Sequence, residues 1–171
     1  MKYGVAIFPS KKLQDLANSY RKRYDTKYAF IPPHLTLKQP FEATETEISA
    51  VAERLKDIAR KFQPFSLNVT KAKSFQPVSN TIYFKVELSK ELEDLHEMLH
   101  DENFFKNETE HAFVPHITIA QDLSDNEHSD VLGQLSMLDV SHEEEVKRIH
   151  LLYQLEDGTW TVYETFRLGA E

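Results

Sequence analysis

The sequence predicts an α+β, bilobed fold, in which two antiparallel sheets with outer helices are arranged by a pseudo-two-fold axis around a central cleft. Three observations support this prediction. Helix-like and strand-like segments alternate throughout, and residues 89–171 approximately repeat the order of elements in residues 1–88. A five-residue phrase also occurs once in each half, with its histidines His34 and His116 82 residues apart. We therefore expect a single domain, residues 1–171, built from these two lobes, with or without exchange of strands between them.

Hydrophobic periodicity and turn residues define the elements of the first half. Apolar residues that recur every three or four positions predict amphipathic helices, whereas strict alternation or a short apolar run predicts a strand. Proline residues 9, 40 and 64 mark element ends, because proline interrupts both helices and ladders. In order, the predicted elements are a strand over residues 3–8, a helix over about 11–24, the first motif strand, a helix from Thr44 or Thr46 to about 62, and a hairpin of residues 65–75 and 81–88.

The second half shows the same kinds of pattern. Ser89 opens one helical segment, and Asp122, Ser124 and Asp125 precede another, whereas the serine expected as an N-cap is Ser10, before the first helix. Glu156-Asp157-Gly158 is a hairpin turn signal. In order, the predicted elements are a helix over about 89–101, a loop over 102–111, the second motif strand over 113–120, a helix to about 137, and a hairpin of residues 146–154 and 159–168.

The repeated phrase is Pro33-His34-Leu35-Thr36-Leu37 in the first half and Pro115-His116-Ile117-Thr118-Ile119 in the second. Side chains alternate between the two faces of a strand, so His and Thr share one face and the aliphatic residues share the other. Each copy therefore anchors an imidazole and a hydroxyl on a strand whose opposite face is buried. If the two strands face each other across a cleft, two imidazoles and two hydroxyls converge.

Such a constellation suits in-line attack at phosphorus. One neutral imidazole can take a proton from the nucleophile while the other, protonated, gives a proton to the leaving oxygen, because histidine titrates near neutrality. The hydroxyls of Thr36 and Thr118 can donate to the non-bridging oxygens. No metal or cofactor is required by this scheme. The symmetry of the motifs leaves open whether His34 or His116 is the acid.

Two His-aliphatic-Thr-aliphatic motifs at this spacing resemble those of the 2H phosphoesterase superfamily, which includes 2′-5′ RNA ligase-like proteins and cyclic nucleotide phosphodiesterases. The small bacterial YjcG-like phosphoesterases are the most similar members. The resemblance covers essentially the whole chain and implies a cleft enzyme that hydrolyses phosphoric diesters without a metal. It also implies His34 as proton donor, His116 as proton acceptor, and Thr36 and Thr118 as phosphate-binding residues.

The chain departs from the RNA-ligase-type members in two places. Lys38-Gln39-Pro40-Phe41 follows the first motif where those proteins continue with an aromatic-Leu-Gly sequence, and Gln121 stands where they often carry an arginine. These differences argue against a role in RNA ligation or tRNA splicing and leave the hydrolytic centre unchanged. Lys38 lies on the same strand face as Thr36, so we expect it either to approach a substrate phosphate or to lie in solvent at the strand end.

Charge is distributed unevenly along the chain. Net charge is −8, which argues against generic nucleic-acid binding. Residues 1–85 carry 15 Lys and Arg against 7 Asp and Glu, whereas residues 86–171 carry 5 against 21. The basic half could attract a phosphate or an RNA end, or its charges could be solvated helix faces. For the basic cluster at residues 21–23 we favour interaction with the helix dipole over phosphate contact.

We therefore predict hydrolysis of a nucleotide or RNA-end phosphodiester, either a 2′,3′-cyclic phosphate or a 2′-5′ linkage. A non-catalytic module that binds RNA ends or nucleotides in the same cleft is the alternative. A more distant alternative is a zinc peptidase, because His96-Glu97-Met98-Leu99-His100 matches the H-E-x-x-H pattern on a predicted helix. The metzincin extension is absent, and we expect these residues to be polar positions on a solvated helix.

The chain contains no cysteine, which excludes disulfides and thiolate catalysis. No segment approaches the length of a membrane span, so we expect no membrane association and a cytoplasmic location. No motif implies a stable protein partner, and the oligomeric state is left open.

Overall fold

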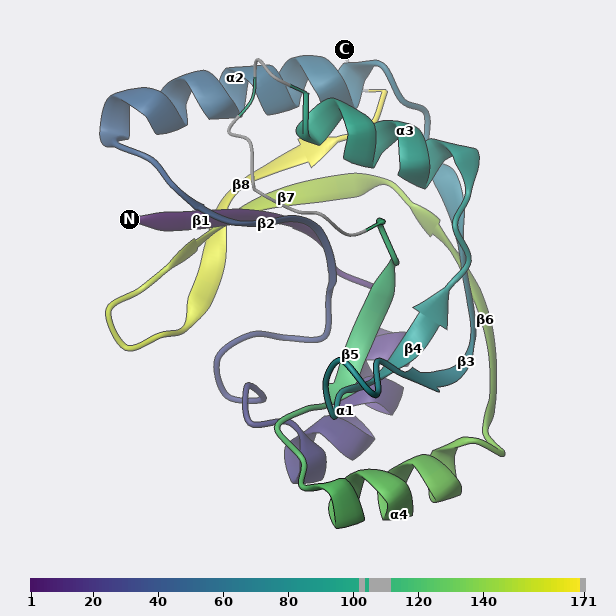
Figure 1. Cartoon of the computed structure of the whole chain (residues 1–171). Helices are drawn as coiled ribbons and strands as arrows, with labels where there is room; N and C mark the ends of the chain where they lie inside the picture. The colour runs from purple at the N-terminus through teal and green to yellow at the C-terminus, as the bar shows by residue number, and fades with distance from the viewer. Residues whose placement is uncertain (102–103, 105–111, 170–171) are drawn as a thin grey trace.

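The computed structural model describes residues 1–101, 104 and 112–169 (Figure 1). Within these residues there are four helices and eight strands. The helices are α1 (Lys11–Tyr24), α2 (Glu45–Arg60), α3 (Lys90–Leu99) and α4 (Asp125–Leu135). The strands are β1 (Lys2–Ile7), β2 (Leu35–Glu42), β3 (Phe65–Ser74), β4 (Ile82–Val86), β5 (His116–Ala120), β6 (Asp139–Val146), β7 (Arg148–Gln154) and β8 (Trp160–Arg167).

The strands of the described residues form one curled antiparallel sheet in the order β6-β3-β4-β5-β2-β1-β7-β8 (Figure 1). The α+β class is confirmed, but the prediction of two separate sheets is wrong. The physical reason lies at the middle of the sheet, where β2 and β5 pair with each other at Leu35 and Ile117. The motif strands therefore share a hydrogen-bonded seam instead of facing each other from two sheets.

The two halves of the chain exchange strands across this seam. The C-terminal hairpin β7–β8 extends the sheet beyond β1, while β3 and β4 lie between β5 and β6. The sequence position near residue 88 therefore does not coincide with a boundary in the sheet. One consequence is that residues 154–160, at the tip of the last hairpin, come close to the loop that precedes the first motif: the Trp160 N–H donates to the Phe30 carbonyl at 2.8 Å.

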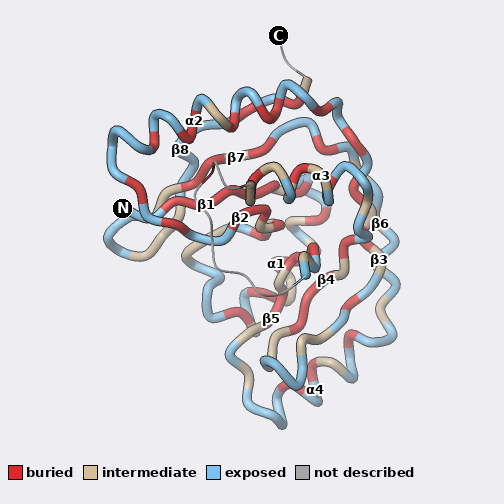
Figure 2. Tube along the Cα trace, turned by 45° about the horizontal axis from the view of Figure 1, so that its top comes forward, coloured by how far each residue is buried: buried red, intermediate tan, exposed pale blue. Residues whose placement is uncertain are grey.

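The helices form where the sequence supplies an apolar stripe, and α2, α3 and α4 also have a side-chain cap. Ser10, which was expected to cap α1, makes no side-chain cap bond. Thr44 and Ser124 begin α2 and α4 with complete capping boxes, in which Glu47 and Glu127 return the hydrogen bond to the cap residue's backbone. α2 packs against β7 and β8, α3 against β2, α1 against β5 and α4 against β3. Figure 2 shows the buried positions concentrated along the central strands and on the inner sides of the helices. Among the described residues, no helix is long and apolar enough to cross a membrane.

Strand β6 was not expected from the sequence. Its segment, Asp-Val-Ser-His-Glu-Glu-Glu-Val, has three consecutive glutamates and therefore a low intrinsic strand propensity. Pairing with β3 over residues 65–71 overrides that propensity, and charged residues are suited to an edge strand because they discourage further pairing. Glu144 has a second role, since its carboxylate accepts the Ser10 N–H at the start of α1, at 2.7 and 3.0 Å to its two oxygens.

Two other boundaries differ from the prediction. β2 continues through Pro40 to Glu42, although Pro40 was expected to end this strand. The second motif strand begins at His116, three residues later than the sequence predicted. The loop predicted over residues 102–111 lies outside the described residues, apart from Phe104, which is buried against the core.

We predict that the seam between β2 and β5 is essential for stability. Leu35 is fully buried there, so Leu35→Ala leaves a cavity and should lower the free energy of unfolding by about 3 kcal/mol. Val162→Ala on β8, where the side chain is 42% exposed, is the matched control and should change it by less than about 0.5 kcal/mol. Urea denaturation of both variants measures the difference. A cost for Leu35→Ala no larger than that of the control would show that the seam is dispensable.

Candidate active site

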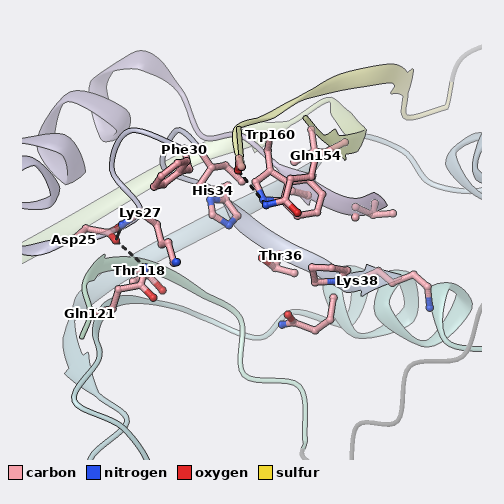
Figure 3. Close-up of a pocket in the computed structure, with 18 of the residues that line it drawn as sticks. Asp25, Lys27, Phe30, His34, Thr36, Lys38, Thr118, Gln121, Gln154 and Trp160 are labelled. Atoms are coloured by element: carbon pink, nitrogen blue, oxygen red, sulfur yellow. Dashed lines mark hydrogen bonds between the residues drawn. The ribbon is translucent and has the colours of Figure 1, made fainter. Parts of the chain in front are cut away.

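The structure brings the two copies of the repeated phrase together. The antiparallel pair Leu35–Ile117 aligns His34 with Thr118 and Thr36 with His116, so the motifs are related by an approximate two-fold axis through this pair. The two aliphatic side chains are fully buried, and the histidines and threonines are half-buried on the opposite face. All four polar side chains line one cleft of about 630 Å³ (Figure 3).

Each imidazole is fixed by a bond to the backbone two residues earlier. His34 Nδ1 lies 2.9 Å from the Pro32 carbonyl oxygen, and His116 Nδ1 lies 2.7 Å from the Val114 carbonyl oxygen. A carbonyl oxygen can only accept, so Nδ1 carries the proton of the neutral ring and donates it. In both motifs Nε2 is therefore left with its lone pair, as a general base requires.

The proline in each phrase explains this shared geometry. Pro33 and Pro115 separate each histidine from the residue whose carbonyl accepts its bond. A residue that precedes proline is restricted to extended conformations, and proline itself fixes its own φ. The prolines thereby hold the accepting carbonyl in place before the motif strand begins.

Burial lowers the pKa of both imidazoles. The pKa of His34 is lowered to about 4, chiefly by loss of hydration, with further lowering by Arg21 and His116 and partial compensation from the Pro32 bond and Asp25. Burial also lowers the pKa of His116, against the opposing effect of its bond to Val114. Both rings are consequently neutral at pH 7 in the free cleft. A bound anion would raise both pKa values, since it favours the charged form of a neighbouring base.

Two aromatic rings support His116 from the side. The imidazole contacts Phe75 and Tyr83 edge-on, with ring centroids 4.9 Å and 5.4 Å away. Phe75 and Tyr83 stack on each other at 4.2 Å. These contacts restrict the rotation of the ring, so its Nε2 is held in one direction.

A buried ion pair lies beside the first motif. Arg21 Nε donates to Asp25 at 3.0 Å, and both side chains are only 2% exposed. The same guanidinium donates to Asn18 at 2.7 Å and to the Ile31 carbonyl at 2.6 Å. Helix-dipole interaction, which the sequence favoured for this basic cluster, is therefore an incomplete description of Arg21, which lines the cleft.

Asp25 extends this ion pair to the second motif. Gln121, which follows β5 directly, donates from Nε2 to Asp25 Oδ1 at 2.7 Å, and the backbone N–H of Lys27 donates to the same oxygen at 2.8 Å. The Gln121 backbone N–H donates to the Tyr24 carbonyl at 3.0 Å. The end of α1, the loop before His34 and the end of β5 are thereby tied to one carboxylate.

The remaining wall of the cleft comes from loops that carry no motif. Phe30 lies beside the β7–β8 hairpin, where Gly158 has φ +93° and a Cβ there would lie 3.3 Å from the Phe30 ring. Gln154 donates to the Gly158 carbonyl at 3.0 Å, which fixes the turn. Figure 3 shows Trp160 and Phe30 on the same side of the cleft as His34, and the Lys27 side chain directed into it. From the sequence, none of these residues was assigned to the site, although Gly158 was identified as a turn residue.

Lys38 occupies neither of its two expected environments. Its side chain turns away from Thr36 toward α3 (Figure 3), is 1% exposed, and donates to the Leu99 carbonyl at 3.0 Å. The rings of Phe41 and Phe104 lie 5.6 Å and 5.0 Å from its ammonium group. Burial lowers the pKa of Lys38 to about 8. The residue therefore joins β2 to the C-terminus of α3, where a cation is favourable.

His96 and His100 do not form a recognisable zinc site. Their rings stack face to face at 4.0 Å, His96 also stacks on Phe113 at 4.1 Å, and Glu97 is exposed. In the part of the chain that the structure describes, no three potential metal-ligating side chains of the His, Cys, Asp or Glu type come together. The two histidines are half-buried packing residues, and not the solvated positions that the sequence predicted.

The fold and the paired motifs define a class of protein, and comparison with known families identifies it. The family model of the 2′-5′ RNA ligase superfamily matches residues 8–158. A protein of Bacillus licheniformis named "Putative phosphoesterase" is 59% identical over 170 residues, covering 99% of this chain and all of the relative. A Bacillus pumilus protein of the same name is 58% identical over 171 residues, covering 100% and 99%. The chain belongs to the 2′-5′ RNA ligase superfamily, which confirms the resemblance drawn from the motifs.

Crystal structures agree in fold. Protein TT0787 of Thermus thermophilus superposes with a TM-score of 0.77 at 19% identity over the whole of both chains. Escherichia coli LigT complexed with 3′-AMP superposes with a TM-score of 0.72 at 17% identity, covering 98% of this chain and 97% of LigT. At this level of identity the similarity establishes the common architecture.

We predict that His34 remains neutral far below the usual pH for histidine. Titration followed by imidazole ¹H–¹⁵N NMR should give a midpoint near pH 4 with the Nδ1–H tautomer, and inorganic phosphate should move the midpoint upward. Because this folded-state pKa lies below the unfolded value, His34 should reduce stability as pH falls from about 6.5 to about 4. A midpoint at or above 6.5 in the free protein would contradict the burial on which this prediction depends.

We predict strong coupling between Arg21 and Asp25. Arg21→Met leaves a buried carboxylate without its cation and should destabilise the fold by about 3–5 kcal/mol. Arg21→Met/Asp25→Asn removes that charge and keeps an acceptor for Gln121, so the double variant should recover part of the loss. A double-mutant cycle by urea denaturation measures the coupling, which should reach about 1–3 kcal/mol. Strictly additive effects would mean that the two side chains act independently.

Proposed function

We propose that this protein is a phosphoric diester hydrolase in which His34 and His116 act as an acid–base pair on a nucleotide or RNA-end phosphodiester. The observation that carries the proposal is the matched pair of imidazoles in one cleft, each with Nδ1 bonded to a backbone carbonyl and Nε2 available. The names of the relatives, which call them phosphoesterases, support the reaction class.

In the proposed reaction, Nε2 of His116 takes a proton from the attacking water as the new P–O bond forms. His34, protonated on Nε2, gives its proton to the leaving ribose oxygen as the old P–O bond breaks. His34 has a pKa of about 4 in the free cleft, so protonation depends on the bound phosphodiester, whose negative charge raises that pKa. Exchange of protons with solvent then restores both rings. The assignment of donor and acceptor follows the family resemblance, because the motifs themselves are nearly symmetric.

The threonines have a complementary role in this proposal. Each lies opposite the histidine of the other motif, so a phosphorus atom between the imidazoles is flanked by the hydroxyls of Thr36 and Thr118. Their O–H groups can donate to the non-bridging oxygens, where negative charge accumulates in the transition state. Lys27, directed into the same cleft, supplies a cation for this charge (Figure 3).

The candidate substrates are 2′,3′-cyclic phosphates and 2′-5′ linkages. Crystal structures of LigT with 3′-AMP and with NADP+ describe a protein of this fold with nucleotides bound. Phe30 and Trp160 give the present cleft aromatic surface of the kind that holds a nucleobase. Acid–base chemistry by two imidazoles needs no metal, so we propose a metal-independent reaction.

Kinetics on purified protein, with EDTA present and a panel of nucleoside 2′,3′-cyclic phosphates and 2′-5′ dinucleotides, test this function. His34→Ala and His116→Ala should each reduce kcat/KM by about 10²–10⁴-fold, because each removes one proton transfer. Thr36→Val and Thr118→Val should reduce it about a hundredfold through loss of a donor. His142→Gln on the edge strand β6 is the matched control and should leave the rate unchanged.

Three outcomes would argue against the proposal. Turnover that survives both single histidine replacements would show that the two histidines are not the acid–base pair. Activity that is lost in EDTA and restored by a divalent cation would show that the reaction requires a metal. Tight binding of the panel with no turnover would favour the alternative function, a module that binds nucleotides or RNA ends.

A further inference from the structure

We propose that the cleft selects a nucleotide with a single phosphate group and rejects substrates with a second phosphate, through the carboxylates of Glu156 and Asp157 in the β7–β8 turn. This inference rests on the proposed function for the position of the reacting phosphate at the two motifs. It goes beyond that function because it distinguishes a small mononucleotide from the phosphorylated or polymeric RNA end that the motifs alone allow.

The charges that line the cleft are balanced. Its charged lining side chains comprise three cations, Arg21, Lys27 and Lys38, and three carboxylates, Asp25, Glu156 and Asp157. Two of these cations already interact with other groups of the protein. Arg21 is paired with Asp25, and the Lys38 ammonium group is buried against the end of α3. In the free cleft, with both imidazoles neutral, Lys27 is the one remaining cation of this lining set. Protonation of His34 on binding adds a positive charge at the motifs, where the first phosphate lies, and none at the turn, so the charges of this set favour one phosphate group over two.

Two of the three carboxylates lie together, in the turn of the last hairpin. Lys27 and the Arg21–Asp25 pair belong to the segment that leads to His34, whereas Glu156 and Asp157 lie in the turn of the last hairpin. Phe30 and Gly158, which are in contact, mark where this turn meets the first segment. A ligand that reaches from the motifs to this turn therefore meets two carboxylates there.

Asp157 is a fixed negative charge. Its Oδ1 accepts from the backbone N–H of Thr159 at 2.9 Å and from the Thr159 hydroxyl at 2.6 Å. These bonds lower the pKa of Asp157, so the carboxylate stays ionised throughout the range in which the histidines titrate. The turn that carries it is held by the Gln154 bond to the Gly158 carbonyl, and it cannot move away without breaking this bond.

A ligand with a phosphate at one end only fits this arrangement. The cleft volume of about 630 Å³ is in the range of small-ligand pockets. Base and ribose amino or hydroxyl groups can donate to the carboxylates at the turn. A second phosphate, or the next phosphate of an RNA chain, would meet two like charges there, and the net charge of −8 opposes a polyanion at longer range.

Calorimetric titration with two product-like probes tests the inference without requiring turnover. Adenosine 3′-monophosphate and adenosine 3′,5′-bisphosphate differ only by the second phosphate, and neither contains a diester bond to be hydrolysed. At low salt the wild-type protein should bind the monophosphate about tenfold more tightly. Raising the salt to about 0.3 M should narrow this ratio, because screening weakens the repulsion.

Replacement of the two carboxylates tests whether they cause the preference for the monophosphate. Glu156→Gln/Asp157→Asn keeps an oxygen acceptor for Thr159 and removes both charges, so the bisphosphate should gain affinity and the ratio should approach one. Glu143→Gln/Glu145→Gln on the exposed side of β6 changes net charge by the same amount and should retain the tenfold ratio. A bisphosphate that binds wild-type protein as tightly as the monophosphate overturns the inference. So does a preference that persists in Glu156→Gln/Asp157→Asn.

The same data separate this inference from the proposed function. If the monophosphate is preferred and no diester in the kinetic panel is hydrolysed, the selectivity stands and the hydrolase proposal fails. If diesters are hydrolysed and the bisphosphate binds equally well, the hydrolase stands and the single-phosphate inference fails.

Discussion

The antiparallel pairing of β2 with β5 at Leu35 and Ile117 is the constraint on which the site depends. If the pairing register shifted by one residue in either direction, the aliphatic side chains would move to the polar face and the polar side chains to the buried face, because side chains alternate along a strand. The complete burial of both aliphatic side chains therefore fixes the register, and the register aligns each histidine with the threonine of the other motif. The geometry of the candidate site is therefore a consequence of core packing on the opposite side of the same two strands.

A second set of interactions fixes the segments next to this seam. The Arg21–Asp25 pair and its bond to Gln121 connect the end of α1, the loop before the first motif and the end of the second motif strand. Buried ion pairs contribute little net stability, but removal of one partner is costly, so such a pair suits a place where geometry must be unique. Lys38 also connects two elements next to the seam, because its ammonium group joins the first motif strand to the end of α3.

Local sequence signals predicted most of the elements because the signals and the structure have the same physical origin. Thr44, one of the two residues expected to begin a helix, caps α2, and Ser124, expected to precede a helix, caps α4, since a cap is satisfied within four residues of itself. The pairing of strands involves residues far apart in sequence, and no local pattern encodes it, so the two-sheet prediction failed. β6 failed for the same reason: its glutamates oppose strand formation locally, and only the edge of β3 makes the segment extended. Lys27 and Phe30 join the site from a loop and Trp160 from the start of β8, where a side chain's neighbours depend on the whole fold.

By itself the sequence determined the polar side chains of the candidate site and how each is presented. A repeated Pro-His-aliphatic-Thr-aliphatic phrase specifies an extended entry, an imidazole and hydroxyl on one face and an anchor on the other, because strand alternation and proline geometry are local properties. Only the tertiary structure decided that the two phrases share one seam, that Arg21 faces a buried carboxylate, and that the last hairpin supplies Glu156 and Asp157 to the cleft. These features depend on contacts between segments far apart in the sequence, and such contacts form only when the whole chain is folded.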